Sequence, residues 1–374
     1  MKNKELVIAI VVLVVVVVVI GLFVVYSNGN SDEDVIKIGV VSTLTGFGAS
    51  WGDDIIKGID LAVKEINTGG GIKGKKIKVI YEDMGEVDLS AAASAARKFV
   101  SVDDVDVILT QWAEDTSVVW PIATENNIVT INIASGADDI PRSDPLVFMI
   151  RPLSSEFTEK IIDYAISEGY ENPVIISEQN AYFTNLGDVT NGIWEEKTGK
   201  KMKRYEVITF ERDYKTQMTK IKDEGNDAIF LQITQNIVPA ALKDIEELNL
   251  NIQIFGYVGI DDDLVIEASG ESIEGLIYTD FEDSDPEFIE KFNNEYGHDP
   301  VVAADLAYDA IKIIEVSYKS NEISTEGLVK GLHNIQNYSA ASGLITIDEN
   351  GARVGDNFVL KVISDGEGVL IDGE

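Results

Sequence analysis

The feature that most constrains the fold is a regular alternation of short apolar runs with longer amphipathic segments. Residues 36–41 (IKIGVV) are typical of a strand, and residues 53–67 place their apolar side chains on one helical face. A second strand is expected over 76–83, after a glycine-rich stretch that a helix could not continue through. This strand–helix–strand order predicts a parallel sheet with right-handed helical crossovers.

The same alternation continues along the chain and predicts two such sheets. At 374 residues the chain is long enough for two domains of ordinary size. Pro152 and the polar stretch after it mark a plausible crossing between them. The expected fold class is therefore α/β with two parallel-sheet units. Further strands are expected over 106–110, 128–133, 147–150, 173–177, 227–233 and 252–257, and helices over 89–102, 117–126, 187–197 and 238–248.

The N-terminus carries a strong membrane signal. Residues 6–26 form an apolar run of 21 residues without a charge, which as a helix would cross a hydrocarbon core of about 30 Å. Lys2 and Lys4 precede the run, so the positive-inside rule leaves residues 1–5 in the cytoplasm. We predict an uncleaved transmembrane anchor, a polar tether over 27–34 and an extracytoplasmic remainder. A cleaved signal peptide is the alternative, although its apolar region would normally be shorter.

Charge and cysteine content exclude several classes of partner and chemistry. The 65 acidic residues outnumber the 30 basic ones and give a net charge of -35, which would repel nucleic acid. Cysteine is absent, so disulfides and thiolate metal sites cannot form. The two histidines cannot supply a histidine-rich metal centre. We therefore expect no metal site, and we interpret the acidic residues as a solvated surface.

The loop after the first strand, TLTGFGASWG from Thr43 to Gly52, is close to a dinucleotide-binding loop. Its glycines read G-x-G-x-x-x-G, one residue longer than the dinucleotide pattern, and the next acid that could hold a ribose lies about 30 residues on instead of about 20. Phe47 and Trp51 would also crowd a pyrophosphate. We expect no nucleotide cofactor. The acidic run over 261–263 is expected to be a solvated loop and helix cap, not a cation site.

Longer stretches of the sequence resemble a known family. The opening over 36–83, from IKIGVVSTLTG to KVIYED, is similar to type I periplasmic solute-binding proteins of the leucine/isoleucine/valine-binding group. Matching pieces follow in the same order: AARKFVSVDDVDVILT, WPIATENNIVTINIASGADD, FIEKFNNEYGHDPVVAADLAYDAIKII and SGLITIDENG. The resemblance extends over residues 35–374.

This resemblance implies two Rossmann-like lobes joined by three crossings, near Pro152, Tyr278 and Ser339. Lobe one would hold 35–151 and 280–338, and lobe two would hold 152–279 and 339–374. Proteins of this kind close on a small molecule and deliver it to ABC permease subunits, without a cofactor and without catalysis. A ligand-sensing ectodomain that signals through a partner membrane protein is one alternative, and an enzyme on a similar fold is another.

The resemblance also implies where a ligand would lie in lobe one. Phe47 and Trp51 could cover an apolar group, although core packing explains Trp51 and Trp112 equally well. Thr116 and Ser117, at a helix start, could hold a carboxylate with hydroxyl and backbone N–H groups. The whole expected set over both lobes is Phe47, Trp51, Trp112, Glu114, Asp115, Thr116, Ser117, Ala134, Ser135, Gly136, Tyr182, Phe183, Thr234 and Asp261.

The implied site departs from the family at two places. Glu114 and Asp115 stand beside the expected carboxylate site, where a further carboxylate is costly if both are desolvated. Val258 stands where the family has the acid that pairs with a ligand ammonium. Asp261 could replace that acid after a small shift of the loop, or Glu114 or Asp115 could take the ammonium from the other lobe. The solute class is therefore left open among amino acids, amines, amides, polyols and cyclic compounds.

Overall fold

The computed structural model describes residues 35–371 except 47, 86, 87, 139, 141–143, 210, 302, 356 and 357. The expected tip, anchor and tether over 1–34 lie outside the described residues. Within the described part, no helix is both long and apolar enough to cross a membrane.

The strands are β1 (Val35–Ser42), β2 (Lys76–Asp83), β3 (Val107–Thr110), β4 (Val129–Asn132), β5 (Val147–Met149), β6 (Val174–Glu178), β7 (Lys203–Val207), β8 (Ala228–Gln232), β9 (Gln253–Phe255), β10 (Ile277–Phe281), β11 (Tyr338–Ala340), β12 (Gly343–Ile347), β13 (Arg353–Val354), β14 (Phe358–Ser364) and β15 (Glu367–Leu370). The α-helices are α2 (Ala49–Thr68), α3 (Leu89–Lys98), α4 (Ala113–Glu125), α5 (Ser154–Ser167), α6 (Ala181–Thr198), α7 (Lys215–Glu224), α8 (Val238–Glu247), α9 (Asp263–Ser269), α10 (Pro286–Tyr296), α11 (Ala304–Ser320) and α12 (Thr325–His333). Shorter helical turns are η3 (Phe99–Asp103), η4 (Gln235–Ile237) and η5 (Gly270–Ile273).

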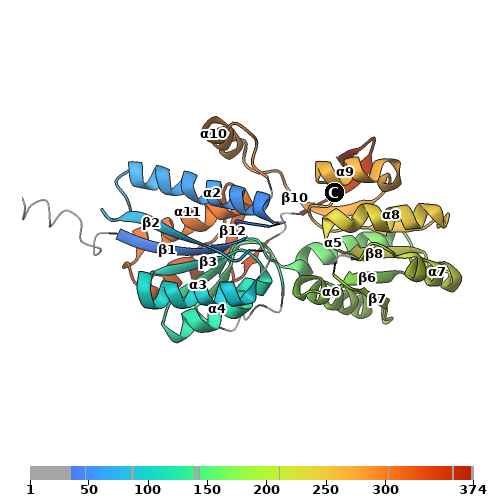
Figure 1. Ribbon diagram of the computed structural model, residues 1–374, viewed down its shortest axis with the longest axis horizontal. Coiled ribbons are helices and arrows are strands. Elements are labelled where there is room, and N and C mark those ends of the chain that lie inside the picture. The colour runs from blue at the N-terminus through green and yellow to red at the C-terminus, as the bar shows by residue number, and fades with distance from the viewer. Residues whose placement is uncertain are drawn as a thin grey trace, which may run out of the picture.

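The first sheet is parallel throughout, in the order β2-β1-β3-β4-β5. Apolar side chains of β1 alternate between its two faces, because successive side chains of a strand point to opposite sides. Ile38 enters the core beneath α2 and α11, whereas Val41 enters the core beneath α3 and α4. Figure 1 shows these helices on either side of the sheet. The predicted apolar face of α2 is confirmed, since Ile55 and Ile59 are fully buried.

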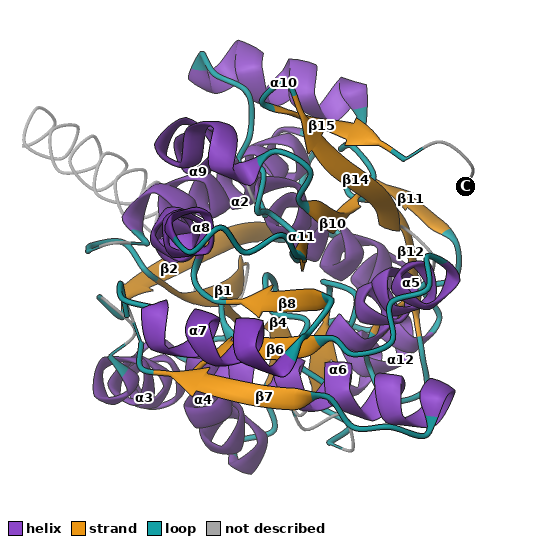
Figure 2. Ribbon diagram, turned by 90° about the vertical axis from the view of Figure 1, so that its right-hand side faces the viewer, coloured by secondary structure: helices purple, strands orange, loops and turns teal. Residues whose placement is uncertain are grey.

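The second sheet has the order β15-β14-β10-β9-β8-β6-β7. Its central strands are parallel, and β14 and β15 add an antiparallel edge. In β6, Val174 and Ile176 pack with α7, α8 and α9, while Ile175 packs with α5 and α6. Figure 2 shows α7 and α8 on the opposite side of these strands from α5 and α6. Each sheet therefore has helices and a core on both faces, as parallel sheets require.

Three connections join the two sheets. They follow β5, β10 and β13. After β10 the chain returns to the first sheet, on which it packs α10, α11, α12 and the small sheet β11-β12-β13. The third connection lies after Val354, which differs from the expected crossing near Ser339. Ile345 and Ile347 of β12 are buried in the first core, and this burial holds the segment up to Val354 in lobe one. The α/β two-lobe fold is nevertheless the one that the alternation predicted.

The ends of the strands in both sheets lead toward the junction of the lobes (Figure 1). β3 runs into α4 in lobe one, and β6 runs into α6 in lobe two. These two helices contact each other across the junction. In open parallel sheets, ligands bind beyond the carboxyl ends of the strands. The topology therefore directs the search for a site to the loops between the lobes.

Candidate functional site

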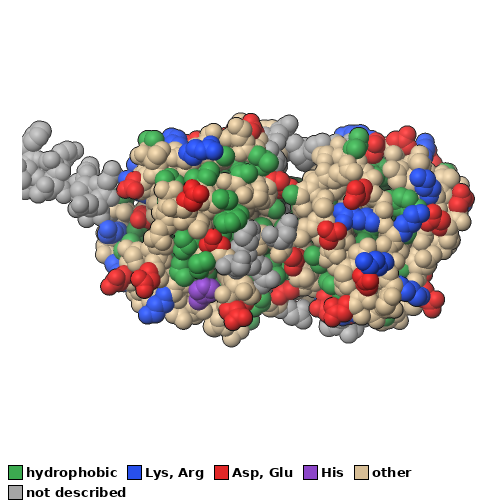
Figure 3. Space-filling model, turned by 90° about the horizontal axis from the view of Figure 1, so that it is seen from below, with side chains coloured by type: hydrophobic (Ala, Val, Ile, Leu, Met, Phe, Trp, Pro, Cys, Tyr) green, Lys and Arg blue, Asp and Glu red, His purple; other side chains and the backbone are tan. Residues whose placement is uncertain are grey.

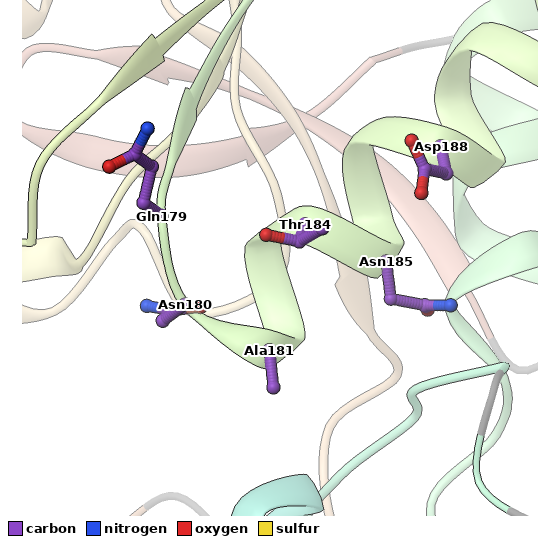
Figure 4. Close-up of a pocket in the computed structure, with 6 residues that line it drawn as sticks. All are labelled: Gln179, Asn180, Ala181, Thr184, Asn185 and Asp188. Carbon is purple, nitrogen blue, oxygen red and sulfur yellow. The ribbon is translucent and has the colours of Figure 1, made fainter.

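The loops that follow the strand ends of both lobes meet at this junction. The backbone N–H of Asp138, in the loop after β4, donates to Oδ1 of Asn185 on α6 at 3.0 Å. The ring of Tyr182, at the start of α6, packs against an apolar group that includes Ala113 and Leu153. A pocket of about 470 Å³ opens beside this contact (Figure 4). The residues that line it are Gln179, Asn180, Ala181, Thr184, Asn185 and Asp188.

The expected ligand contact of Trp51 and Trp112 stays a prediction, and we call these two partly exposed residues the wall of lobe one. The rings of Trp51 and Trp112 meet edge to face, with centroids 5.5 Å apart. The indole Nε1 of Trp112 donates to Oγ1 of Thr43 at 3.4 Å, which ties the start of α4 to the loop after β1. Both rings are partly exposed, as a pocket wall requires. Phe47, expected beside them, lies outside the described residues.

The start of α4 uses its polar side chains internally. The Asp115 carboxylate is fully buried and accepts from the backbone N–H groups of Gln111 and Trp112 at 2.9 and 2.7 Å. Burial raises the pKa of Asp115 to about 7, against the opposing effect of these two hydrogen bonds. Asp115 therefore caps the helix and does not face the junction as a free acid. Glu114, one residue earlier, is half-buried.

The hydroxyl groups expected to hold a carboxylate are also committed elsewhere. Thr116 is fully buried, and its Oγ1 contacts the Trp112 carbonyl oxygen at 2.6 Å and Oγ1 of Thr110 at 2.7 Å. Ser117 Oγ donates to the Glu114 carbonyl oxygen at 2.6 Å. Such bonds to the preceding turn are a common use of Ser and Thr in helices. The expected anion-binding role of Thr116 and Ser117 is therefore not supported by their contacts.

The turn over Ala134, Ser135 and Gly136 is fixed against the first connection. Ser135 N–H donates to Oδ1 of Asn132 at 2.8 Å, and Ser135 Oγ accepts from Ala137 N–H at 3.2 Å. A Cβ atom on Gly136 would lie 2.4 Å from the carbonyl oxygen of Pro152, so only glycine fits. These residues shape the junction through their backbone.

Lobe two contributes a row of aromatic rings. Tyr182 and Phe183 have ring centroids 5.1 Å apart, and Phe183 and Tyr257 have centroids 5.2 Å apart. Asn180 positions the first two, because its Oδ1 accepts from Phe183 N–H at 2.9 Å and so caps α6. Tyr257 was not expected from the sequence, and its hydroxyl donates to the Ile233 carbonyl oxygen at 2.6 Å. Val258 lies in the same apolar group.

Three acids of lobe two accept hydrogen bonds from groups of their own lobe. Oδ2 of Asp261 accepts from the hydroxyl of Tyr278 at 2.8 Å. Glu178, which the sequence did not single out, is fully buried and accepts from both N–H and Oγ1 of Thr234 at 2.7 and 2.6 Å. Thr234 thus directs its hydroxyl to Glu178. Asp262 caps α9 by accepting from Leu264 N–H at 2.9 Å, as expected for the acidic run.

A buried arginine between the lobes was also not expected from the sequence. Arg151, in the first connection, is 7% exposed. Its Nη1 donates to the Ala134 carbonyl oxygen of lobe one at 2.7 Å, and its guanidinium lies over the ring of Phe281 of lobe two at 5.1 Å. The sequence did not predict the buried position of Arg151, because an isolated arginine near a proline resembles an ordinary surface residue.

The loop after β1 also contains a G-x-S-x-G pattern, from Gly48 to Gly52, which in hydrolases carries a serine nucleophile. Ser50 lies in the first turn of α2. His298 cannot serve it as a base, because both ring nitrogens are engaged. Nε2 contacts Lys57 Nζ at 2.8 Å, and Nδ1 contacts the Asp299 carbonyl oxygen at 2.8 Å. The pattern here forms a turn into a helix.

Comparison with known proteins agrees with the resemblance read from the sequence. A family model described as "Periplasmic binding protein" matches residues 35–367. The Leu/Ile/Val-binding protein homolog 3 of Brucella melitensis is 24% identical over 343 residues, which cover 89% of this chain and 92% of that protein. A leucine-binding protein of Thermotoga maritima has a TM-score of 0.81 at 22% identity, over 90% of this chain and 98% of the other. A solute-binding protein of an R. palustris ABC transporter, solved with 4-hydroxybenzoate, has a TM-score of 0.80 at 17% identity, over 91% and 96%. The chain belongs to the periplasmic binding protein family.

Proposed function

We propose that this protein is the extracytoplasmic solute-binding component of an ABC importer, and that it binds an amino acid or a related small carboxylate between its lobes. The observation that supports this most directly is the meeting of strand-end loops and aromatic walls from two separately packed sheets. Ala113 of lobe one and Tyr182 of lobe two pack in one apolar group, and Trp112, which precedes Ala113, contacts the ring of Trp51. A solute that contacts both walls would favour the closed arrangement of the lobes.

The family supports the extracytoplasmic setting and the transport role. Relatives on this fold differ in the solutes that their names give, leucine, isoleucine and valine in some and 4-hydroxybenzoate in another. A carboxylate is the chemical group that these solutes have in common. In our proposal, residues 6–26 anchor the protein in the membrane, the tether presents the two lobes, and permease subunits receive the solute.

A ligand panel read by thermal unfolding tests this proposal. The protein is heated with leucine, isoleucine, valine, 4-hydroxybenzoate, and a set of amines, amides and polyols. A bound solute at a hundred times its dissociation constant should add about 2.7 kcal/mol to the free energy of unfolding. Absence of a shift with every solute in the panel would contradict a binding role.

Matched variants locate the site in the same experiment. Trp51→Ala removes part of the wall of lobe one and should reduce the ligand-induced shift. Val102→Ala changes a side chain that is 72% exposed on η3 and should leave the shift unchanged. Equal shifts in the two variants would place the solute away from the junction.

A further inference from the structure

Three polar groups at the junction are buried without a hydrogen-bond partner among the described residues. They are Nε of Arg151, Oγ of Ser154 and the hydroxyl of Tyr182. Ser154 is fully buried and Arg151 is 7% exposed. All three groups can donate a hydrogen bond. Leaving a buried donor without an acceptor is costly, so such a set calls for an acceptor that the described residues do not supply.

The three donors are close neighbours. Arg151 lies in the first connection, Ser154 begins α5 three residues later, and Tyr182 reaches them from the start of α6. Burial raises the pKa of Tyr182, and Arg151 and Ser154 lie near enough to offset part of that rise. Ser154 is close to the phenol, yet neither hydroxyl completes a hydrogen bond. The set therefore includes groups from the connection and from lobe two, and Ala134 of lobe one holds the arginine in place.

The charge of Arg151 is not balanced by an ion pair with an acid in the described part of the chain. Its guanidinium contacts the Ala134 carbonyl oxygen at 2.7 Å and the ring of Phe281 at 5.1 Å, and neither carries a charge. Asp138 and Glu114 are the acids whose charge reaches Tyr182, and Oδ2 of Asp138 accepts from Ser155 N–H at 3.1 Å. A guanidinium buried without a counterion is unfavourable, and a carboxylate matches its two parallel donors.

The surroundings of these donors are apolar and aromatic. Phe281 lies beneath the guanidinium, and the rings of Tyr182, Phe183 and Tyr257 continue from it within one apolar group. Val258 belongs to the same group. Phe183 and Tyr257 are buried, so a flat, apolar solute body would meet this aromatic wall at the partly exposed rings of Tyr182 and Phe281, since aromatic rings pack well edge to face or offset.

Among the described acids of lobe two, Asp261 and Glu178 offer an ammonium group no comparable partner. Asp261 accepts from Tyr278, and Glu178 accepts two hydrogen bonds from Thr234 behind the wall. A cationic group near Arg151 would also be repelled. The described contacts of lobe two therefore favour an anion without an ammonium group, whereas the acids whose charge reaches Tyr182, Glu114 and Asp138, belong to lobe one.

We propose that Arg151, Ser154 and Tyr182 form the carboxylate site, and that the solute is an aromatic monocarboxylate of the benzoate class that lacks an ammonium group. This inference rests on the proposed function and names its solute class. Because the three donors are closed off here, the lobes must part at the connections to admit the solute. The carboxylate then satisfies all three donors at once, and the ring lies along the aromatic wall.

Calorimetric titration of the full chain with benzoate, benzamide and leucine tests the inference. Benzoate and benzamide share their ring and differ in the charge that Arg151 would recognise. Benzoate should bind, benzamide should bind at least about 30-fold more weakly, and leucine should also bind more weakly than benzoate. Preference for leucine over benzoate would overturn this inference and leave the proposed function standing. If none of the three ligands binds and no solute of the panel shifts thermal unfolding, the proposed function itself is contradicted.

Variants separate recognition of charge from a structural role for the arginine. Arg151→Met should abolish the preference for benzoate over benzamide, while Arg97→Met, an exposed arginine on α3, should preserve it. Equal weakening of both ligands by Arg151→Met would mean that Arg151 only supports the Ala134 turn. Tyr182→Phe removes a single hydroxyl and gives a milder check if Arg151→Met fails to fold. It should weaken benzoate about 3- to 10-fold and benzamide less, and an unchanged benzoate affinity would contradict the site.

Discussion

At the scale of single residues, glycines set how closely the loops of the junction can approach. A Cβ atom on Gly52 would lie 1.8 Å from the carbonyl oxygen of Thr43, because α2 starts directly against the loop after β1. This contact brings Trp51 beside Trp112. The glycine spacing that resembled a dinucleotide loop therefore has a packing cause.

Replacing Gly52 by alanine should destabilise the protein by about 1 to 3 kcal/mol, since the methyl group forces backbone apart. Gly192 is the matched control, because it is also helical and a Cβ there meets no atom within 4 Å. Gly192→Ala should stabilise the protein by about 0.5 to 1 kcal/mol through higher helix propensity. Urea unfolding of both variants measures the difference, and effects of the same sign would contradict the close contact at Gly52.

Asp309 on α11 is a buried acid whose ionisation should make stability depend on pH. Burial raises its pKa to about 6, although it accepts from Ala341 N–H at 2.8 Å and from Ser342 N–H and Oγ at 2.8 and 2.6 Å. A pKa raised on folding means that the folded state favours the protonated form. The contribution of Asp309 to stability is therefore complete below about pH 4 and is lost as pH rises through 6.

Asp309→Asn removes this titration and isolates it from the other acids. The free energy of unfolding of the wild type, minus that of the variant, should fall by about 2 kcal/mol between pH 4.5 and 7.5. Urea unfolding at both pH values gives the two differences. A difference that stays constant, or that rises with pH, would show that the folded state favours the ionised form of Asp309.

The contacts of single side chains were harder to predict from the sequence than the positions of the elements that carry them. Trp51, Trp112 and Tyr182 were expected to face a ligand from the family resemblance, and that contact stays a prediction. In the structure the rings of Trp51 and Trp112 meet, and Tyr182 packs against the apolar group of Ala113 and Leu153. Thr116 was expected to face a ligand, yet its side chain bonds back to the Trp112 carbonyl oxygen. Position along a strand–loop–helix unit follows from hydrophobic periodicity, whereas the rotamer of one polar side chain depends on partners distant in sequence. Arg151 was missed for the same reason, since only the fold brings Ala134 and Phe281 to it.

At the scale of elements, the strand–helix alternation gave the two sheets, but the return of the chain was harder to place. The small sheet β11-β12-β13 follows the helices of lobe one and precedes β14 of lobe two. A short alternating strand can pack on either lobe with equal local propensity. Burial of Ile345 and Ile347 beside α11 decides the matter in favour of lobe one.

Neighbouring positions of β12 provide the test of this assignment. Ile345 is fully buried and Leu344 is 50% exposed. Ile345→Ala should destabilise the protein by about 2 to 4 kcal/mol, whereas Leu344→Ala should cost less than about 0.5 kcal/mol. Amide hydrogen exchange in Ile345→Ala should increase mainly in β1 and β4, not in β6 and β8. Faster exchange confined to lobe two would show that β12 packs on lobe two instead of lobe one.

At the scale of the whole molecule, an excess of acid covers two separately packed lobes. Paired one to one, 30 basic residues leave at least 35 of the 65 acidic ones without a basic partner. Acidic side chains are spread over the visible face of both lobes and are not gathered in one patch (Figure 3). Their mutual repulsion acts against both the compact fold and the closing of the lobes. Salt weakens such repulsion, because the screening length falls from about 30 Å at 0.01 M to about 8 Å at 0.15 M.

Raising potassium chloride from 0.01 to 0.3 M at pH 7.5 should therefore raise the unfolding temperature by on the order of 5 °C. Most of the gain should come below 0.15 M, where the screening length changes most, whereas a general solute effect would grow steadily into the molar range. Sucrose at equal osmolality is the non-ionic control. Near pH 4 about half of the carboxylates are protonated, so the gain from salt should shrink there. An equal gain at both pH values would mean that repulsion between surface acids is not what limits the stability of this fold.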